Sequence, residues 1–208
     1  ERGMICPHIA AGINLNLPVV GSLLRKGGAF FLRRSFRDNP LYAAVFNKYL
    51  SLILAKGLPI EYFVEGGRSR TGRLLSAKPG MLSMTVRGFL RNPSRPLAFV
   101  PVFFGYERLM EGKSYISELS GQAKQRETLF GLVKSLKVLR KRFGRVYVNF
   151  GEPIPLEELL DQHHARWREH DVQREERPAW LQGMVRDLGD RVLRGINDAA
   201  AVNPVNLV

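Results

Sequence analysis

A segment rich in glycine and arginine is the part of this sequence best suited to hold a phosphate group. It covers residues 65–73, reads EGGRSRTGR and follows the β-like run at 60–64. Glycines permit backbone conformations in which successive amides surround one anion. The guanidinium groups of Arg68 and Arg70 add forked donors that match phosphate oxygens. The segment therefore predicts a phosphate-binding loop with the Glu65 carboxylate at its mouth.

The spacing excludes two known phosphate-binding motifs. Gly67 and Gly72 are placed like the two glycines of a P-loop, but the next two residues are Arg73 and Leu74, where that motif needs Lys and then Ser or Thr. The Gly-x-Gly-x-x-Gly spacing of a dinucleotide-binding turn is also missing from the segment. On the residues alone, a solvated glycine-rich turn with surface arginines stays open as the alternative.

Two other apolar runs carry candidate residues. Arg33 and Arg34 follow the run at 29–32, and side chains alternate along a strand, so at most one of the two faces a given site. Pro101 interrupts the apolar run at 97–104. Because a proline lacks the amide donor that a central strand needs, an edge strand or a bulge with a packing role is the favoured interpretation of Pro101.

Short apolar runs alternate with amphipathic segments along the whole chain. Strands are expected at residues 9–14, 29–33, 60–64, 97–104 and 145–150. Helices are expected over 41–55, 81–90, 124–143 and 180–200, with another beginning at 155–160. Buried strands separated by helices predict an α/β fold with a mixed, mostly parallel central sheet flanked by helices. Ligands of such sheets gather beyond the carboxyl ends of strands, which indicates the segments after Leu32, Val64 and Val102.

The charge balance favours anionic partners. The 208 residues carry 32 Lys and Arg against 19 Asp and Glu, a net charge of +13, and a single cysteine, Cys6, which excludes an internal disulfide. A basic nucleic-acid-binding module is one alternative, but the arginines stand beside glycines after strands and not along one exposed helix. The basic amphipathic segment 124–143 could lie on an anionic membrane, although packing on the sheet is the favoured interpretation.

Three segments in the same order resemble the motif blocks of a known family. The segments 28–34 (GAFFLRR), 63–70 (FVEGGRSR) and 100–102 (VPV) are similar to the second, third and fourth blocks of the glycerolipid acyltransferases. The longer stretches 61–73, 104–107 and 146–155 resemble the large membrane-associated bacterial glycerol-3-phosphate acyltransferases. The resemblance implies transfer of a fatty acyl group from acyl-CoA or acyl carrier protein to the sn-1 hydroxyl of glycerol 3-phosphate, with no other cofactor and no metal.

The resemblance also implies roles for particular residues. Arg34, Arg68 and Arg70 would hold the substrate phosphate. Glu65 and Gly66 would shape the site around the glycerol. Pro101 would help to form the acyl-donor side. The full set of expected substrate-binding residues is Arg33, Arg34, Glu65, Gly66, Gly67, Arg68, Ser69, Arg70, Thr71 and Pro101.

The first motif block of the family, His-x-x-x-x-Asp, has no counterpart among these residues. His8, His163, His164 and His170 are followed five residues later by Ile13, Arg168, Glu169 and Glu175. In the family this histidine is the general base on the attacking hydroxyl, so no catalytic residue is assigned to this chain. We expect the block upstream of Glu1, and a noncatalytic phosphate-binding or membrane-binding relative stays open as the alternative.

The same resemblance predicts domain organisation and location. Residues 1–155 would form an acyltransferase domain without its catalytic block, and residues 156–208 a helical C-terminal extension of that domain. The expected location is the cytoplasmic face of the bacterial inner membrane, with a peripheral attachment to the anionic phospholipid surface and no nucleic-acid partner. Because the catalytic block is missing, we expect the 208 residues alone to be inactive.

Overall fold

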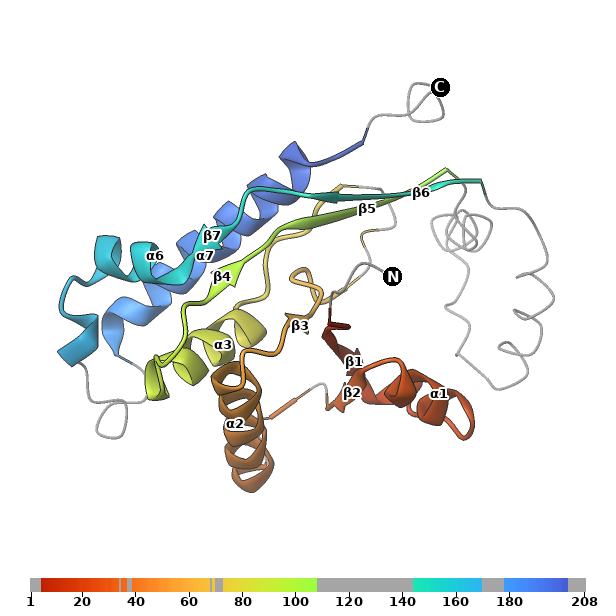
Figure 1. Cartoon of the computed structure of the whole chain (residues 1–208), viewed down its shortest axis with the longest axis horizontal. Coiled ribbons are helices and arrows are strands. Elements are labelled where there is room, and N and C mark those ends of the chain that lie inside the picture. The colour runs from red at the N-terminus through yellow and green to blue at the C-terminus, as the bar shows by residue number, and fades with distance from the viewer. Residues whose placement is uncertain are drawn as a thin grey trace.

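Three parallel strands form the sheet at the N-terminal end of the chain (Figure 1). The computed structural model describes residues 5–33, 35–36, 39–67, 69, 73–107, 144–169 and 178–201. The strands are β1 (His8–Gly12), β2 (Ala29–Leu32) and β3 (Ile60–Glu61), in the order β2-β1-β3. All of their pairs are parallel, as expected for strands joined by helical crossovers.

Two helices make these crossovers. Helix α1 (Val20–Lys26) joins β1 to β2 through a short 3-10 turn, η1 (Ile13–Leu15), and α2 (Pro40–Ala55) joins β2 to β3. Asn39 caps α2, because its side-chain oxygen accepts a hydrogen bond of 2.9 Å from the amide of Tyr42. The expected helix over 41–55 is confirmed, whereas α1 was not expected from the sequence.

Two antiparallel pairs follow in the second half of the chain. Strand β4 (Ala98–Phe99) pairs with β7 (Ile154–Pro155), and β5 (Val102–Tyr106) pairs with β6 (Val146–Phe150). The expectation of one continuous strand over 97–104 was wrong, because the strand breaks at Val100 and Pro101. Val102 consequently begins a strand in place of ending one, and it lies outside the parallel sheet.

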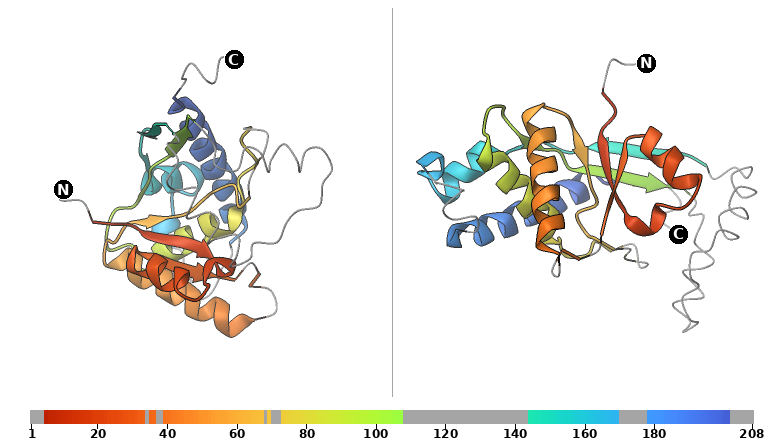
Figure 2. Two further views of the ribbon diagram at one scale, coloured as in Figure 1. Left: turned by 90° about the vertical axis from the view of Figure 1, so that its right-hand side faces the viewer. Right: turned by 90° about the horizontal axis from the view of Figure 1, so that it is seen from below.

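A layer of helices packs the apolar core. It consists of α3 (Pro79–Arg91), α6 (Leu156–His163), the turn η2 (Trp167–Glu169) and α7 (Ala179–Asp198). Helix α3 contacts both α2 and α7 (Figure 2). The core includes fully buried residues of three helices: Leu82, Val86 and Phe89 of α3, Leu156 and Leu160 of α6, and Met184 and Leu188 of α7. The helices expected near 81–90, 155–160 and 180–200 are confirmed, and the one over 124–143 lies outside the described residues.

The predicted α/β class is confirmed by a parallel sheet, two antiparallel strand pairs and flanking helices. Helices α6 and α7 share their core with α3, and the domain boundary expected after residue 155 stays a prediction. In the part of the chain that the structure describes, no helix combines the length and the apolar character needed to cross a membrane.

Candidate functional site

The carboxyl ends of the three parallel strands bring two of the expected segments to one edge of the sheet. Gly12 at the end of β1 lies opposite Leu32 at the end of β2, and Ile9 of β1 lies opposite Glu61 at the end of β3. Arg33 and the loop that begins after Glu61 therefore leave the sheet at the same edge. This edge is where open α/β sheets bind their ligands.

The loop after β3 is closed at its base by two hydrogen bonds. The carbonyl oxygen of the buried Val64 accepts a bond of 2.8 Å from the amide of Lys78. The carboxylate oxygen Oε2 of Glu65 accepts one of 2.7 Å from the amide of Leu75. The Glu65 carboxylate, expected at the mouth of the loop, therefore binds the returning limb of the loop to its outgoing limb.

Gly66 has a backbone conformation that favours glycine. Its φ angle is +63°, in the left-handed region. A Cβ atom there would lie 2.9 Å from Cγ of Lys78, whereas a Cβ at Gly67 would have no neighbour closer than 3.9 Å. The turn therefore requires a glycine at position 66, whereas position 67 has room for a side chain.

Tyr62 anchors the start of the loop to α3. The side chain is partly buried against the helical core, and its hydroxyl lies 3.3 Å from Oγ1 of Thr85. Burial raises the pKa of Tyr62 well above its usual range, and the contact with Thr85 opposes this only in part. Tyr62 is therefore a neutral residue that fixes the position of the loop and carries no charge to the site.

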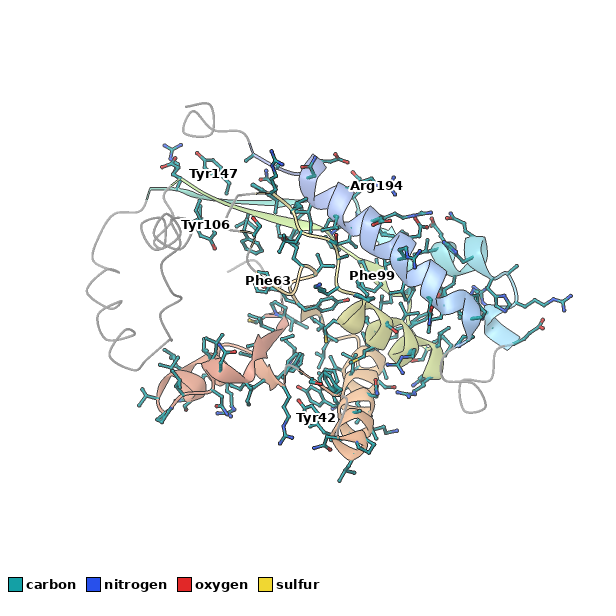
Figure 3. All side chains as sticks on the ribbon, turned by 180° about the vertical axis from the view of Figure 1, so that it is seen from behind. Tyr42, Phe63, Phe99, Tyr106, Tyr147 and Arg194 are labelled. Carbon is teal, nitrogen blue, oxygen red and sulfur yellow. The ribbon has the colours of Figure 1, made fainter. Side chains whose placement is uncertain are left out.

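Arg33 packs against α2. Its amide donates a hydrogen bond of 3.2 Å to the Tyr42 hydroxyl, and its guanidinium carbon lies 5.1 Å from the centre of the Tyr42 ring (Figure 3 labels Tyr42). The side chain is otherwise exposed. The sequence allows at most one of Arg33 and Arg34 to face a given site, and this packing fits Arg33 as the one that faces away. A phosphate-binding role of Arg33 stays a prediction.

The other expected residues of the loop can be placed only in part. Ser69 is half-buried. Four expected residues lie outside the described residues: Arg34, Arg68, Arg70 and Thr71. Their roles stay predictions from the resemblance.

Pro101 is a packing residue away from the sheet edge. It is fully buried, its carbonyl accepts a bond of 2.8 Å from the amide of Gly151, and its Cγ would lie 2.6 Å from a Cβ placed on Gly195 of α7. This is the packing role that the proline within an apolar run indicated. The acyl-donor role implied by the resemblance stays a prediction.

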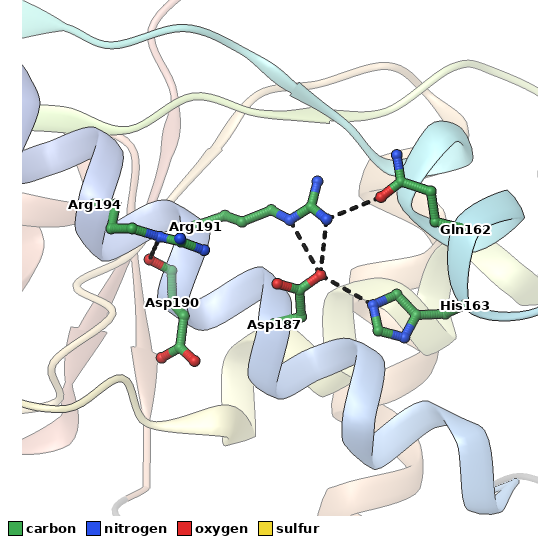
Figure 4. Close-up of polar contacts among 6 residues, drawn as sticks. All are labelled: Gln162, His163, Asp187, Asp190, Arg191 and Arg194. Carbon is green, nitrogen blue, oxygen red and sulfur yellow. Dashed lines mark hydrogen bonds and ion pairs between the residues drawn. The ribbon is translucent and has the colours of Figure 1, made fainter.

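A polar cluster between α6 and α7 was not foreseen from the sequence (Figure 4). The Nε2 atom of His163 lies 3.0 Å from Oδ2 of Asp187, which also meets Arg191 at 2.9 Å, and Arg191 donates to Gln162. The hydrogen bond from His163 is the main cause that lowers the pKa of Asp187; desolvation opposes it, and Arg191 lowers the pKa further. The cluster joins two helices, and His163 and Asp187 are 24 positions apart, beyond the reach of local patterns.

Two of the histidines that were given no catalytic role, His8 and His164, take part in structural contacts. His164 follows α6, donates its amide to the carbonyl of Leu160 and stacks on Trp180 with ring centres 4.9 Å apart. His8 lies within β1, half-buried, and pairs with Ile60 of β3. That neither histidine is the general base stays a prediction.

Comparisons with known proteins match both halves of the chain. The family model described as "Acyltransferase" matches residues 3–105, and the one described as "Glycerol-3-phosphate acyltransferase C-terminal region" matches residues 115–208. Proteins named glycerol-3-phosphate acyltransferase match all 208 residues at 58% identity in Ectopseudomonas mendocina (strain ymp) and Pseudomonas putida (strain W619), and at 56% in Pseudomonas entomophila (strain L48). The chain spans 25% of the length of each of these relatives. With both family models and these identities in agreement, the chain belongs to the glycerol-3-phosphate acyltransferase family.

Proposed function

We propose that the intact protein transfers a fatty acyl group to the sn-1 hydroxyl of glycerol 3-phosphate and that these 208 residues bind the phosphate. The observation that carries the proposal is the closed loop at the carboxyl edge of the parallel sheet, whose sequence holds three arginines among glycines. A basic, glycine-rich loop in this position suits a phosphorylated substrate of low molecular mass.

The proposed roles follow the chemistry of the side chains. Arg34, Arg68 and Arg70 donate hydrogen bonds to the phosphate oxygens. Gly66 lets the backbone turn close to the anion, and the Glu65 carboxylate holds the loop shut by its bond to Leu75. The phosphate contacts would thus fix the position of the glycerol hydroxyl that reacts, which lowers the entropic part of the barrier.

The reaction itself needs a base that this chain does not supply. The hydroxyl oxygen of the substrate forms a bond to the thioester carbonyl carbon, the carbon–sulfur bond breaks, and the hydroxyl proton passes through the base to the departing thiolate. We assign the base to the histidine of the His-x-x-x-x-Asp block, which we expect upstream of Glu1. The acyl donor in this proposal is acyl-CoA or acyl carrier protein.

We also propose a peripheral location at the cytoplasmic face of the bacterial inner membrane. The support is the net charge of +13, which attracts anionic phospholipid headgroups. The same charge would draw in an acidic carrier protein or the phosphates of CoA. The position of the arginines beside glycines continues to disfavour a nucleic-acid partner.

An assay of the full-length protein tests the proposal. The protein in its lipids is given glycerol 3-phosphate with a long-chain acyl-CoA or acyl carrier protein, and the product is analysed for the acylated position. We expect 1-acylglycerol 3-phosphate, and we expect His→Ala in the upstream block, within about one α/β unit of 30 or more residues before Glu1, to abolish turnover. If no donor supports transfer and the upstream block is absent, the protein is a noncatalytic phosphate-binding relative.

A further inference from the structure

The β5–β6 ribbon has one face made only of aliphatic and aromatic side chains. Its register pairs Val102 with Phe150, Phe104 with Val148 and Tyr106 with Val146. Residues directly opposite each other in an antiparallel pair project from the same side. The apolar face of the ribbon is therefore defined by these six residues: Val102, Phe104, Tyr106, Val146, Val148 and Phe150.

Within the described part of the chain most of this apolar face is exposed, whereas the opposite face is in contact with α7 and the residues that follow it. The exposed fraction is 41% for Phe104, 52% for Tyr106 and 70% for Phe150. On the opposite side the side-chain nitrogen Nδ2 of Asn149 donates a bond of 2.9 Å to the carbonyl of Ala199, directly after α7. Within the described part of the chain, α7 thus covers only one side of the ribbon.

The direction in which the apolar face points determines where a covering element would lie. Figure 3 shows Tyr106 and Tyr147 projecting from opposite sides of the ribbon, with Tyr106 on the side of Phe63. Phe63 follows β3 and is 72% exposed. Figures 1 and 2 place the three-stranded sheet on this side of the ribbon as well. A covering element would therefore lie between the ribbon and the parallel sheet and could bury Phe63 together with the apolar face.

The chemistry of the face selects the kind of partner. None of its six residues is charged, although the whole chain carries +13. An anionic membrane surface or a nucleic acid is held through basic side chains, and none of the six residues of this face is basic. A two-stranded ribbon has little stability by itself. A contiguous apolar patch on such a ribbon is typical of an inner layer that a larger fold covers.

The length of the relatives indicates where that layer comes from. The chain spans 25% of each relative, so about three quarters of such a polypeptide lies outside the corresponding residues. We propose that the apolar face of the β5–β6 ribbon packs against an apolar segment of the same polypeptide that lies outside residues 1–208. The proposal depends on family membership and not on acyl transfer, so the two can fail separately.

Site-specific photo-crosslinking in the full-length protein tests the proposal. Phe104 is replaced by the photoreactive analogue p-benzoylphenylalanine, the protein is irradiated, and the cross-linked peptides are identified by mass spectrometry. We expect an intramolecular cross-link to a peptide outside residues 1–208. The same analogue at Asn149, on the opposite face, is the matched control and should link to the peptide that contains Ala199.

Each other outcome overturns the proposal. A link to lipid would identify the face as a membrane contact, a species of twice the mass would identify a second copy, and a link within residues 1–208 would show that the chain covers its own ribbon. Absence of any link, while the Asn149 control reacts, would show a face left in water. If the Phe104 variant does not fold, Val148 of the same face serves as a second position with the same expected result.

Discussion

At the scale of single residues, the loop after β3 depends on a few backbone and carboxylate contacts. Glu65 bonds to the amide of Leu75, and Lys78 bonds to the carbonyl of Val64. Gly66 provides the one positive φ angle among the described residues of the loop. These contacts are local and shape the site before any substrate arrives, so substitutions at these positions should alter stability and substrate binding together.

The two glycines of the loop provide a matched pair of substitutions. Gly66→Ala places a methyl group in a left-handed conformation and 2.9 Å from Lys78, so we expect a loss of about 1–2 kcal/mol in the free energy of unfolding and a raised KM for glycerol 3-phosphate. Gly67→Ala meets no atom closer than 3.9 Å and should leave stability nearly unchanged. Thermal unfolding and steady-state kinetics of the full-length variants check both. Equal effects of the two substitutions would contradict the assigned backbone role.

At the scale of elements, α7 is held by contacts at two points along its length. Gly195 approaches Pro101 near the end of the helix, and Asp187 bonds to His163 of α6. Sequence periodicity predicted α2, α3 and α7 because each has a long apolar stripe. It missed α1, which has only seven residues, and the Asp187 cluster, which depends on how two helices meet.

Gly195 and Gly183 lie on the same helix and should respond with opposite sign. A Cβ at Gly195 would stand 2.6 Å from Pro101, so Gly195→Ala forces a shift and should cost about 1–3 kcal/mol. Gly183→Ala meets nothing within 4 Å and should stabilise the helix by about 0.5–1 kcal/mol. Thermal unfolding of the two variants measures the difference. A stabilising Gly195→Ala would show that α7 does not pack on Pro101 as described.

The Asp187 cluster should contribute a pH-dependent part of the stability. Because the pKa of Asp187 is lowered in the folded protein, its contribution is present above the ordinary value of about 4 and is lost as the pH falls through the lower folded value. Asp187→Asn should therefore lower the free energy of unfolding by about 0.5–1.5 kcal/mol at pH 7 and by progressively less at lower pH.

Asp190→Asn, at an exposed position one turn away, is the control. Unfolding curves from about pH 3 to about pH 7, a range that brackets the ordinary carboxyl pKa, measure the difference in stability. A difference that stays constant over this range would contradict the predicted loss at low pH.

At the scale of the whole molecule, the structure combines a parallel sheet that contacts α1, an antiparallel ribbon that contacts α7, and a core formed mainly by helices (Figure 1). The α/β class could be predicted from the alternation of apolar runs and amphipathic segments. The pairing of β4 with β7 could not, because it joins strands far apart in the sequence, and the break at Pro101 removed Val102 from the expected sheet edge. The parallel sheet edge with the loop remains the part that the sequence located best.

The measurement that tests the central claim most directly is the KM for glycerol 3-phosphate of the full-length enzyme with Arg68→Ala. If the loop holds the phosphate, losing a charged hydrogen bond of about 1.5–3 kcal/mol raises this KM about 10-fold to 100-fold, while the KM for the acyl donor stays the same. Arg168→Ala removes an exposed arginine that pairs with Glu157 and Asp161, and it should change neither constant. An unchanged KM for glycerol 3-phosphate in a folded Arg68→Ala enzyme would contradict the phosphate-binding role of the loop.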